Sequence, residues 1–317
     1  MTTSLHQLNA VPLADLRGGI AVVTGAASGI GLGMLLRCAQ EGMVPVCLDV
    51  NEGQMREAED VLREGAAAAA VSTGVEAAEV LCLRCDAGNY EEVFTVANYI
   101  RQRFPGRPVS FLSANAGFGT PAVLDGRREA IQRGADVHMF GVIWLMQAFK
   151  SSLLAQAPAP CAIVNTSSIA GIMPGGGSYG VFKHASRAIT EATYQEFAAL
   201  GAVHVKVHCL HPGIISTNIS ARRPDGSLAD FSESSGRQRS VFQEAIEDYG
   251  TAPAMLVCLA SLFTYYHILG NWMQVYHGRW FHCNCCMVLT MQAQRVCEAI
   301  EDGRFYIVVP TCRRQRS

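Results

Sequence analysis

Apolar runs of strand length alternate with helix-like segments through the first two thirds of the chain. Strands are predicted over residues 19–25, 44–50, 80–86, 109–117, 161–168 and 203–213. Helices are predicted over 30–42, 52–65, 90–104, 127–155 and 178–200, and the alanine-rich stretch 65–79 is interpreted as a loop or weak helix. This alternation favours βαβ units and an α/β fold, with a parallel sheet that is covered on both faces.

Three glycines lie between the first predicted strand and the first predicted helix, in the stretch VVTGAASGIGLG at 22–33. At this position Gly25 would permit a sharp turn, Gly29 would let the backbone approach a pyrophosphate, and Gly31 would let the helix pack closely on the strand. Amide groups at the start of the helix would then face the phosphates. The pattern indicates a dinucleotide-binding site.

Further motifs follow in a fixed order: NAG at 115–117, TSS ending at Ser168, YGVFK from Tyr179 to Lys183, and HPGIISTNI at 211–219. With the G-x-x-x-G-x-G spacing, they resemble the classical short-chain dehydrogenase/reductase family over about residues 18–220. The resemblance implies a Rossmann-type doubly wound parallel sheet, in a single domain with an atypical C-terminal segment. It also implies an NAD(P)-dependent oxidoreductase that interconverts a secondary alcohol and a ketone by hydride transfer.

The resemblance also implies which residues hold the cofactor. Asp49 ends the second strand, where a carboxylate accepts bonds from ribose hydroxyls and repels a 2′-phosphate. No Arg or Lys stands beside it or at Ser28, so NAD is favoured over NADP. Asp86 would contact the adenine. The expected cofactor-binding set is Thr24, Gly25, Ser28, Gly29, Ile30, Gly31, Asp49, Asp86, Asn115, Ala116, Gly117, Tyr179, Lys183, Pro212, Gly213, Ile215 and Thr217.

The expected catalytic residues are Ser168, Tyr179, Lys183 and His138. Tyr179 and Lys183 are spaced i,i+4, so one helix presents both on the same side. We expect the lysine ammonium and a positive nicotinamide to lower the pKa of the tyrosine, which would then exchange the proton of the substrate hydroxyl. Lys183 would also bind the nicotinamide ribose. Ser168, with Ser167 as the alternative, would orient the substrate oxygen.

Two features depart from the family pattern. His138 stands where the family carries an Asn that helps hold a water between the lysine and solvent. A histidine could serve a related relay, since it has a donor and an acceptor, or its bulk could impair the relay; both interpretations stay open. The spacing from Ser168 to Tyr179 is also shorter than in the family. The triple glycine 175–177 suggests a short, flexible loop that still delivers the tyrosine.

These departures leave two rival functions open. One is a catalytically impaired nucleotide-binding scaffold or redox sensor. The other is a membrane-associated reductase of a lipophilic substrate, because residues 249–278 contain no Lys, Arg, Asp or Glu and are long enough to span a bilayer.

The expected organisation is an N-terminal extension at 1–17, a core at 18–220, and a substrate-lid and C-terminal region at 221–317. Within the last region, the apolar insertion at about 251–291 is interpreted as a lid, a membrane or interface hairpin, or a non-native insertion. Residues 293–310 look like the closing helix and strand of one branch of the family. The HCNCC motif at 282–286 has no second ligand pair nearby, so we expect no metal site.

Composition limits the partners and the compartment. A net charge of −2 and a pI near 6.5 over 317 residues give no basic footprint for nucleic acid. The N-terminus has neither a basic start nor a long apolar run, so we expect a cytoplasmic protein with twelve reduced cysteines. We expect a small apolar alcohol or ketone as substrate, because the only Arg or Lys cluster soon after Gly213 is the pair in ARRPDG at 221–226, which is interpreted as a solvated loop. We also expect a homodimer or homotetramer built on helices 127–155 and 178–200, with membrane contact not favoured.

Overall fold

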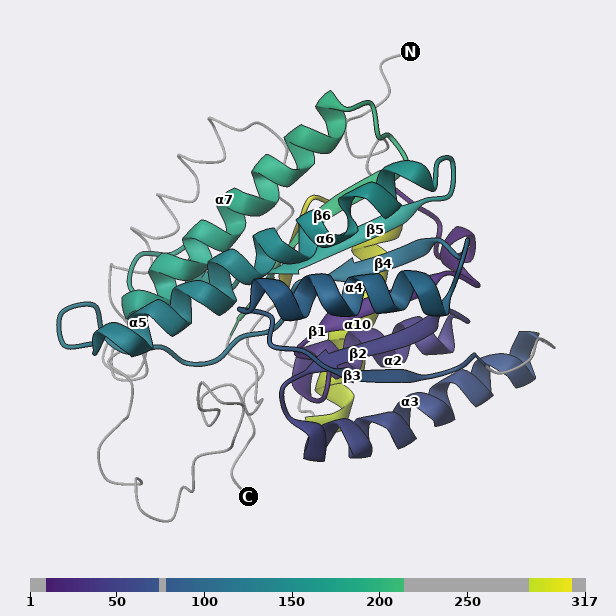
Figure 1. The fold of residues 1–317 in the computed structure, drawn as a ribbon, viewed down its shortest axis with the longest axis horizontal. Coiled ribbons are helices and arrows are strands. Elements are labelled where there is room, and N and C mark those ends of the chain that lie inside the picture. The colour runs from purple at the N-terminus through teal and green to yellow at the C-terminus, as the bar shows by residue number, and fades with distance from the viewer. Residues whose placement is uncertain (1–9, 74–77, 214–284, 310–317) are drawn as a thin grey trace, which may run out of the picture.

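Seven parallel strands form one central sheet in the order β3-β2-β1-β4-β5-β6-β7 (Figure 1). The computed structural model describes residues 10–73, 78–213 and 285–309. The strands are β1 Ile20–Thr24, β2 Val44–Asp49, β3 Leu81–Arg84, β4 Val109–Ser113, β5 Cys161–Thr166, β6 Val205–Pro212 and β7 Tyr306–Val309. The predicted α/β fold with a Rossmann-type parallel sheet is therefore confirmed.

Helices cover both faces of the sheet (Figure 1). One layer contains α2 Gly29–Gln40, α3 Glu52–Thr73 and α10 Cys285–Glu301. The opposite layer contains α4 Tyr90–Arg103, α6 Gly141–Ala155 and α7 Gly177–Ala199, with α5 Arg128–Ala135 extending from it. Each layer has its own apolar cluster against the sheet. Residues on both faces of β1, β2, β4 and β5 are consequently buried along the whole strand.

Two predicted elements differ in detail from the structure. The alanine-rich stretch continues α3 as far as Thr73, in agreement with the helical alternative, because alanine has the highest helix propensity. The predicted helix 127–155 is interrupted by a π-helical turn, Asp136–Phe140, which separates α5 from α6. Among the described residues, Arg128–Ala155 alone has the length and mean hydropathy of a membrane-crossing helix, and half of its apolar window is buried inside the protein.

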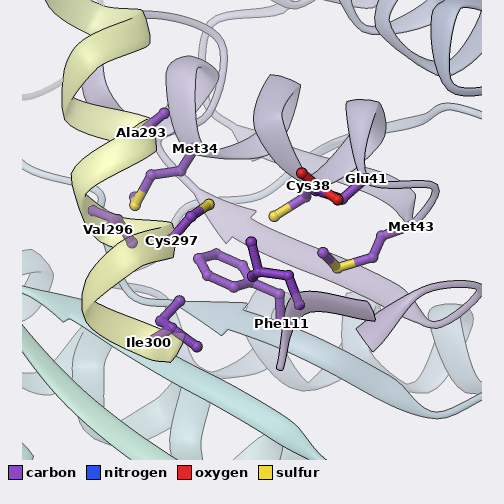
Figure 2. Close-up of a pocket in the computed structure, with 10 residues that line it drawn as sticks. Met34, Cys38, Glu41, Met43, Phe111, Ala293, Val296, Cys297 and Ile300 are labelled. Carbon is purple, nitrogen blue, oxygen red and sulfur yellow. The ribbon is translucent and has the colours of Figure 1, made fainter. Parts of the chain in front are cut away.

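The end of the chain completes the sheet. α10 packs against α2, and β7 adds a seventh strand beside β6, as expected for residues 293–310. Figure 2 shows side chains of α2 and α10 converging on a small, mostly apolar cavity that is no larger than one water molecule needs. Most of the predicted apolar insertion at 251–291, including the start of the HCNCC motif, lies outside the described residues.

Candidate active site

The expected site residues gather at the carboxyl ends of the central strands. The strand order reverses direction between β1 and β4, because the chain builds β1, β2 and β3 outwards on one side and then returns to place β4 on the other side of β1. In open α/β sheets, ligands bind at this switch point, beyond the carboxyl ends of the strands. The loops after β1, β4, β5 and β6 therefore share one edge of the sheet.

The loop after β1 is closed tightly against the loop after β4. Gly25 has a φ of +64°, and a Cβ added there would lie 2.7 Å from the Cα of Ala116. A Cβ on Gly31 would lie 2.3 Å from the Gly25 carbonyl oxygen and 2.6 Å from Asn115 Nδ2. Only glycine fits these two positions, so the backbone of the loop is left bare where α2 begins. The structure also places Ser28 just before α2, and Gly29 and Ile30 in its first turn.

Thr24 and Asn115 hold the two loops together. The Thr24 hydroxyl accepts hydrogen bonds from the amides of Asn115 (3.0 Å) and Ala116 (3.1 Å). The Asn115 side chain donates to the Thr24 carbonyl (3.1 Å), and its Oδ1 accepts from Thr166 (3.1 Å). Three strand ends are thereby fixed relative to one another by buried and half-buried polar groups.

Asp49 and Asp86 lie where the adenosine end of a dinucleotide is expected, at the ends of β2 and β3. The buried Asp49 carboxylate accepts the amides of Ala27 (3.1 Å) and Asn51 (3.0 Å), so it links the glycine loop to β2. The Asp86 carboxylate accepts the Gly88 amide and pairs with Arg133, both at 2.9 Å. Each carboxylate is therefore oriented by the protein before any ligand is present.

Ser168, Tyr179 and Lys183 are brought together after β5 and in the first turns of α7. Ser168 forms a hydrogen bond to the Tyr179 side chain, and the Ser167 hydroxyl instead donates to the Lys183 carbonyl (2.8 Å). The buried Lys183 Nζ donates to the Thr166 carbonyl (2.8 Å) and lies 5.6 Å from the centre of the Tyr179 ring. Of the two candidate serines, Ser168 is thus the one that reaches the tyrosine.

The protein's own groups shift the pKa values of this pair in opposite directions. Burial raises the pKa of Tyr179 to about 12, and the hydrogen bond from Ser168 lowers it only in part. Burial lowers the pKa of Lys183 to about 8. The expectation that the neighbouring lysine lowers the tyrosine pKa does not hold for the protein alone, because loss of solvent outweighs the other effects on the phenolate.

The short loop from Ser168 to Tyr179 depends on the triple glycine. Gly175, Gly176 and Gly177 have φ values of +101°, +81° and +59°, a left-handed run that side chains strongly disfavour. A Cβ on Gly180 would lie 2.0 Å from the Gly175 carbonyl oxygen. The loop therefore folds back directly onto α7, which is how a shortened connection still places Tyr179 beside Ser168.

His138 projects from the π-helical turn into the same site. Its ring lies edge-on to the Tyr179 ring, with 5.4 Å between centroids, and its Nε2 is 2.9 Å from the Phe118 carbonyl oxygen. Burial and the Lys183 charge hold the pKa of His138 well below its usual range, so the ring is neutral. Nε2 contacts the Phe118 carbonyl at 2.9 Å and the Phe118 amide at 3.4 Å, and the shorter contact, to the carbonyl, favours the tautomer with the proton on Nε2. Buried Nδ1 is then an acceptor with no hydrogen-bond partner in the described part of the chain.

Two residues with structural roles at the site were not identified from the sequence. Thr166 binds Asn115 through its hydroxyl and Lys183 through its carbonyl. The buried His211 contacts the Ser168 carbonyl through Nδ1 at 2.9 Å. Thr166 is the first residue of TSS and His211 the first of HPG, and these motif positions were the available signals. Pro212 and Gly213 lie at the end of β6, as expected, whereas Ile215 and Thr217 lie outside the described residues.

Comparison with known proteins identifies the family. The family model described as "short chain dehydrogenase" matches residues 19–227. A crystal structure of a short-chain dehydrogenase/reductase from Burkholderia phymatum in complex with NAD superposes with a TM-score of 0.65 and 26% identity, covering 93% of this chain and 89% of that one.

Two curated relatives have different named activities. Mouse epidermal retinol dehydrogenase 2 is 29% identical over 66% of this chain, and this chain spans 64% of its length. The diacetyl reductase [(S)-acetoin forming] of Staphylococcus epidermidis is 26% identical over 63% of this chain and 72% of its own. The chain belongs to the short-chain dehydrogenase family of oxidoreductases.

Proposed function

We propose that the protein is an NAD-dependent dehydrogenase or reductase that interconverts a secondary alcohol and a ketone. The observation that carries the proposal is the meeting of Ser168, Tyr179 and Lys183 beside the glycine loop, at the edge of the sheet where a dinucleotide would lie. When bound, a nicotinamide dinucleotide accepts or supplies the hydride of such a reaction. The chain's own residues would bind it, orient the substrate and move the proton.

The residues present fit a dinucleotide, and they fit NAD better than NADP. Gly25 and Gly31 form a cradle that a Cβ would fill, and α2 begins there with its backbone amides facing outwards. Asp49 stands at the end of β2, where its negative charge suits ribose hydroxyls and repels a 2′-phosphate. Asp86, held by Arg133, would lie at the adenine.

The proton steps belong to three side chains. Ser168 would donate to the substrate oxygen, and Tyr179 would exchange a proton with that same oxygen. With a pKa of about 12, Tyr179 is a phenol at neutral pH, the form that donates a proton to a carbonyl. Taking a proton from an alcohol requires added stabilisation of the phenolate, and the Lys183 ammonium stands beside the ring to supply it.

His138 would connect Lys183 to the proton relay. Its neutral ring presents a buried acceptor, Nδ1. Gly117 lies between the two side chains: a Cβ added there would lie 2.8 Å from His138 Cε1 and 3.7 Å from Lys183 Nζ. A water held between the two groups would return protons to the lysine. The second candidate function, a scaffold that binds the cofactor with little turnover, rests on this same residue, because the bulk of the ring can also close the relay.

We further propose an apolar substrate, a cytoplasmic location and a homodimer or homotetramer. The substrate class rests on the sequence soon after Gly213, where the only Arg or Lys cluster is the pair in ARRPDG at 221–226, interpreted as a solvated loop. The oligomer would use α6 and α7, which form the outer layer on one face of the sheet (Figure 1).

The test is a fluorescence titration with NADH and NADPH, followed by turnover with a panel of secondary alcohols and ketones. We expect tighter binding of NADH. Tyr179→Phe should keep the NADH affinity and lower kcat by about 100-fold or more, because only the proton-transfer group is lost. Tyr194→Phe, on the same helix and packed on Phe305, is the matched control and should keep wild-type turnover.

Three results would each contradict a part of this proposal. Equal turnover by wild type and Tyr179→Phe would exclude the mechanism. NADH binding without turnover of any substrate in the panel would favour the scaffold. No binding of either dinucleotide would exclude the proposed function.

A further inference from the structure

Two cysteines face each other across neighbouring strands outside the active site. Cys47 of β2 and Cys82 of β3 are register partners in the parallel sheet, and their thiols are hydrogen-bonded to each other. Register partners project from the same face of a sheet. Neighbouring strands run about 4.8 Å apart, which lies within the Cα spacing of about 4.4–6.8 Å that disulfides span. The backbone is therefore already spaced for a cross-link.

The two thiols differ in accessibility and in charge environment. Cys47 is fully buried, whereas Cys82 lies on the edge strand and, among the cysteines whose burial the structure describes, is the one that is not buried. The hydrogen bond from Cys47 is the largest of the effects that lower the pKa of Cys82, and the Arg63 guanidinium on α3 lowers it further, opposed by burial and by Glu59. The same hydrogen bond and burial raise the pKa of Cys47. Cys82 thus has the features of an attacking thiolate, and Cys47 those of a resolving thiol.

We propose that Cys47 and Cys82 form a peroxide-sensitive dithiol, whose disulfide links β2 to β3 and weakens dinucleotide binding. The effect on binding rests on the proposed function, and the cross-link does not. Asp49 follows Cys47 by two residues on the same strand, and its carboxylate holds both the glycine loop and the start of the next segment. Forming the disulfide draws the two sulfur atoms from non-bonded contact to about 2.05 Å, and we expect the resulting shift of β2 at Cys47 to displace this carboxylate, two residues further along the strand, from the ribose position.

The chemistry balances with hydrogen peroxide as the oxidant. The Cys82 thiolate attacks one peroxide oxygen, the O–O bond breaks, and hydroxide leaves and takes up a proton to become water. The resulting sulfenic acid is attacked by the Cys47 sulfur. The S–S bond forms, the S–O bond breaks, and the Cys47 proton leaves with the second water. In total, two thiols lose two electrons and two protons, and one peroxide is reduced to two waters.

A second pair of cysteines gives an internal comparison. Cys38 and Cys297 both line the cavity between α2 and α10 (Figure 2). Both are buried, and burial raises the pKa of each thiol. They lack the exposed partner and the thiol–thiol hydrogen bond of the Cys47–Cys82 pair, so we expect them to stay reduced under the same treatment.

The experiment treats the folded full-length protein with hydrogen peroxide, blocks free thiols by alkylation and maps the tryptic peptides by mass spectrometry. Trypsin releases Cys47 within 38–56 and Cys82 within 64–84, so the disulfide appears as a cross-link of these two peptides. We expect this cross-link in wild type and in Cys38→Ser, and its loss in Cys47→Ser and Cys82→Ser. Arg63→Gln, in which trypsin releases Cys82 within 57–84, should slow formation of the disulfide, because the guanidinium no longer stabilises the thiolate.

NADH affinity is then measured before and after oxidation. We expect the Kd to rise at least about fivefold on oxidation and to recover with a dithiol reductant, and we expect no change in Cys82→Ser treated in parallel. An alkylated Cys82 after peroxide, with no cross-link, would overturn the proposal. A cross-link with unchanged NADH affinity would overturn its regulatory part. If the reduced protein bound no NADH, the proposed function would fail, while the peptide map would still decide whether the dithiol forms a disulfide.

Discussion

The enclosed position of His138 makes an ordinary histidine a neutral acceptor. Its Nε2–H is committed to the Phe118 carbonyl, while the Lys183 charge and burial keep the second nitrogen unprotonated. An asparagine also offers one acceptor and one donor, but on a shorter side chain. A histidine at position 138 can thus take the place of the asparagine in the relay, with its acceptor further from the backbone, provided that Nδ1 is the accepting atom.

Replacing His138 tests this assignment. His138→Phe keeps the ring but removes the acceptor, so we expect kcat to fall by about 10- to 100-fold, with a changed pH profile and an unchanged Kd for NADH. His138→Asn restores an acceptor and should recover a large part of kcat and the wild-type profile. His204→Phe, directly before β6, serves as a control for loss of a histidine elsewhere. If His138→Phe kept both kcat and the pH profile, Nδ1 would have no part in proton transfer.

At the scale of elements, the strands and the polar residues that follow them could be predicted from the sequence. Each strand is a short apolar run bounded by turn residues, and the resemblance supplied the positions after β1, β4 and β5. The π-helical turn at 136–140 could not be predicted, because its residues have no composition that distinguishes a π-helical turn from an α-helical one. The sign of the Tyr179 pKa shift also required the structure, since burial is a property of the assembled site.

The triple glycine 175–177, at the start of α7, gives a prediction about the loop that delivers Tyr179. Gly175 and Gly201 both have positive φ values and open space where a Cβ would lie, so alanine at either should cost about 1–3 kcal/mol of stability from backbone strain. Of these two glycines, only Gly175 lies in the loop that delivers Tyr179. We therefore expect Gly175→Ala to lower kcat and Gly201→Ala to leave it unchanged. The two variants are compared by urea unfolding and by turnover, and equal kcat values would show that the loop tolerates a different entry to α7.

At the scale of the whole molecule, the sheet buries neutral histidines on β6, the strand next to its β7 edge. His208 and His211 lie on β6, between β5 and β7, and burial lowers the pKa of each to about 4. His138 is shifted in the same direction from the neighbouring layer. The unfolded chain binds protons at these sites near the ordinary histidine pKa of about 6.5, whereas the folded protein does not. Protonation therefore favours unfolding.

The stability of the fold should consequently depend on pH in a defined window. The contribution of these depressed pKa values is fully present above about pH 6.5 and is lost as the pH falls towards about 4, at about 1.4 kcal/mol per pH unit for each histidine. Urea unfolding across this window should show a steep loss of the free energy of unfolding. His211→Gln keeps a donor for the Ser168 carbonyl but cannot titrate, so its slope should be shallower by one histidine's contribution, and His208→Gln/His211→Gln should be shallower by two. An unchanged slope in the double variant would mean that β6 admits solvent to these rings, and that the β7 end of the sheet is less tightly closed than its packing indicates.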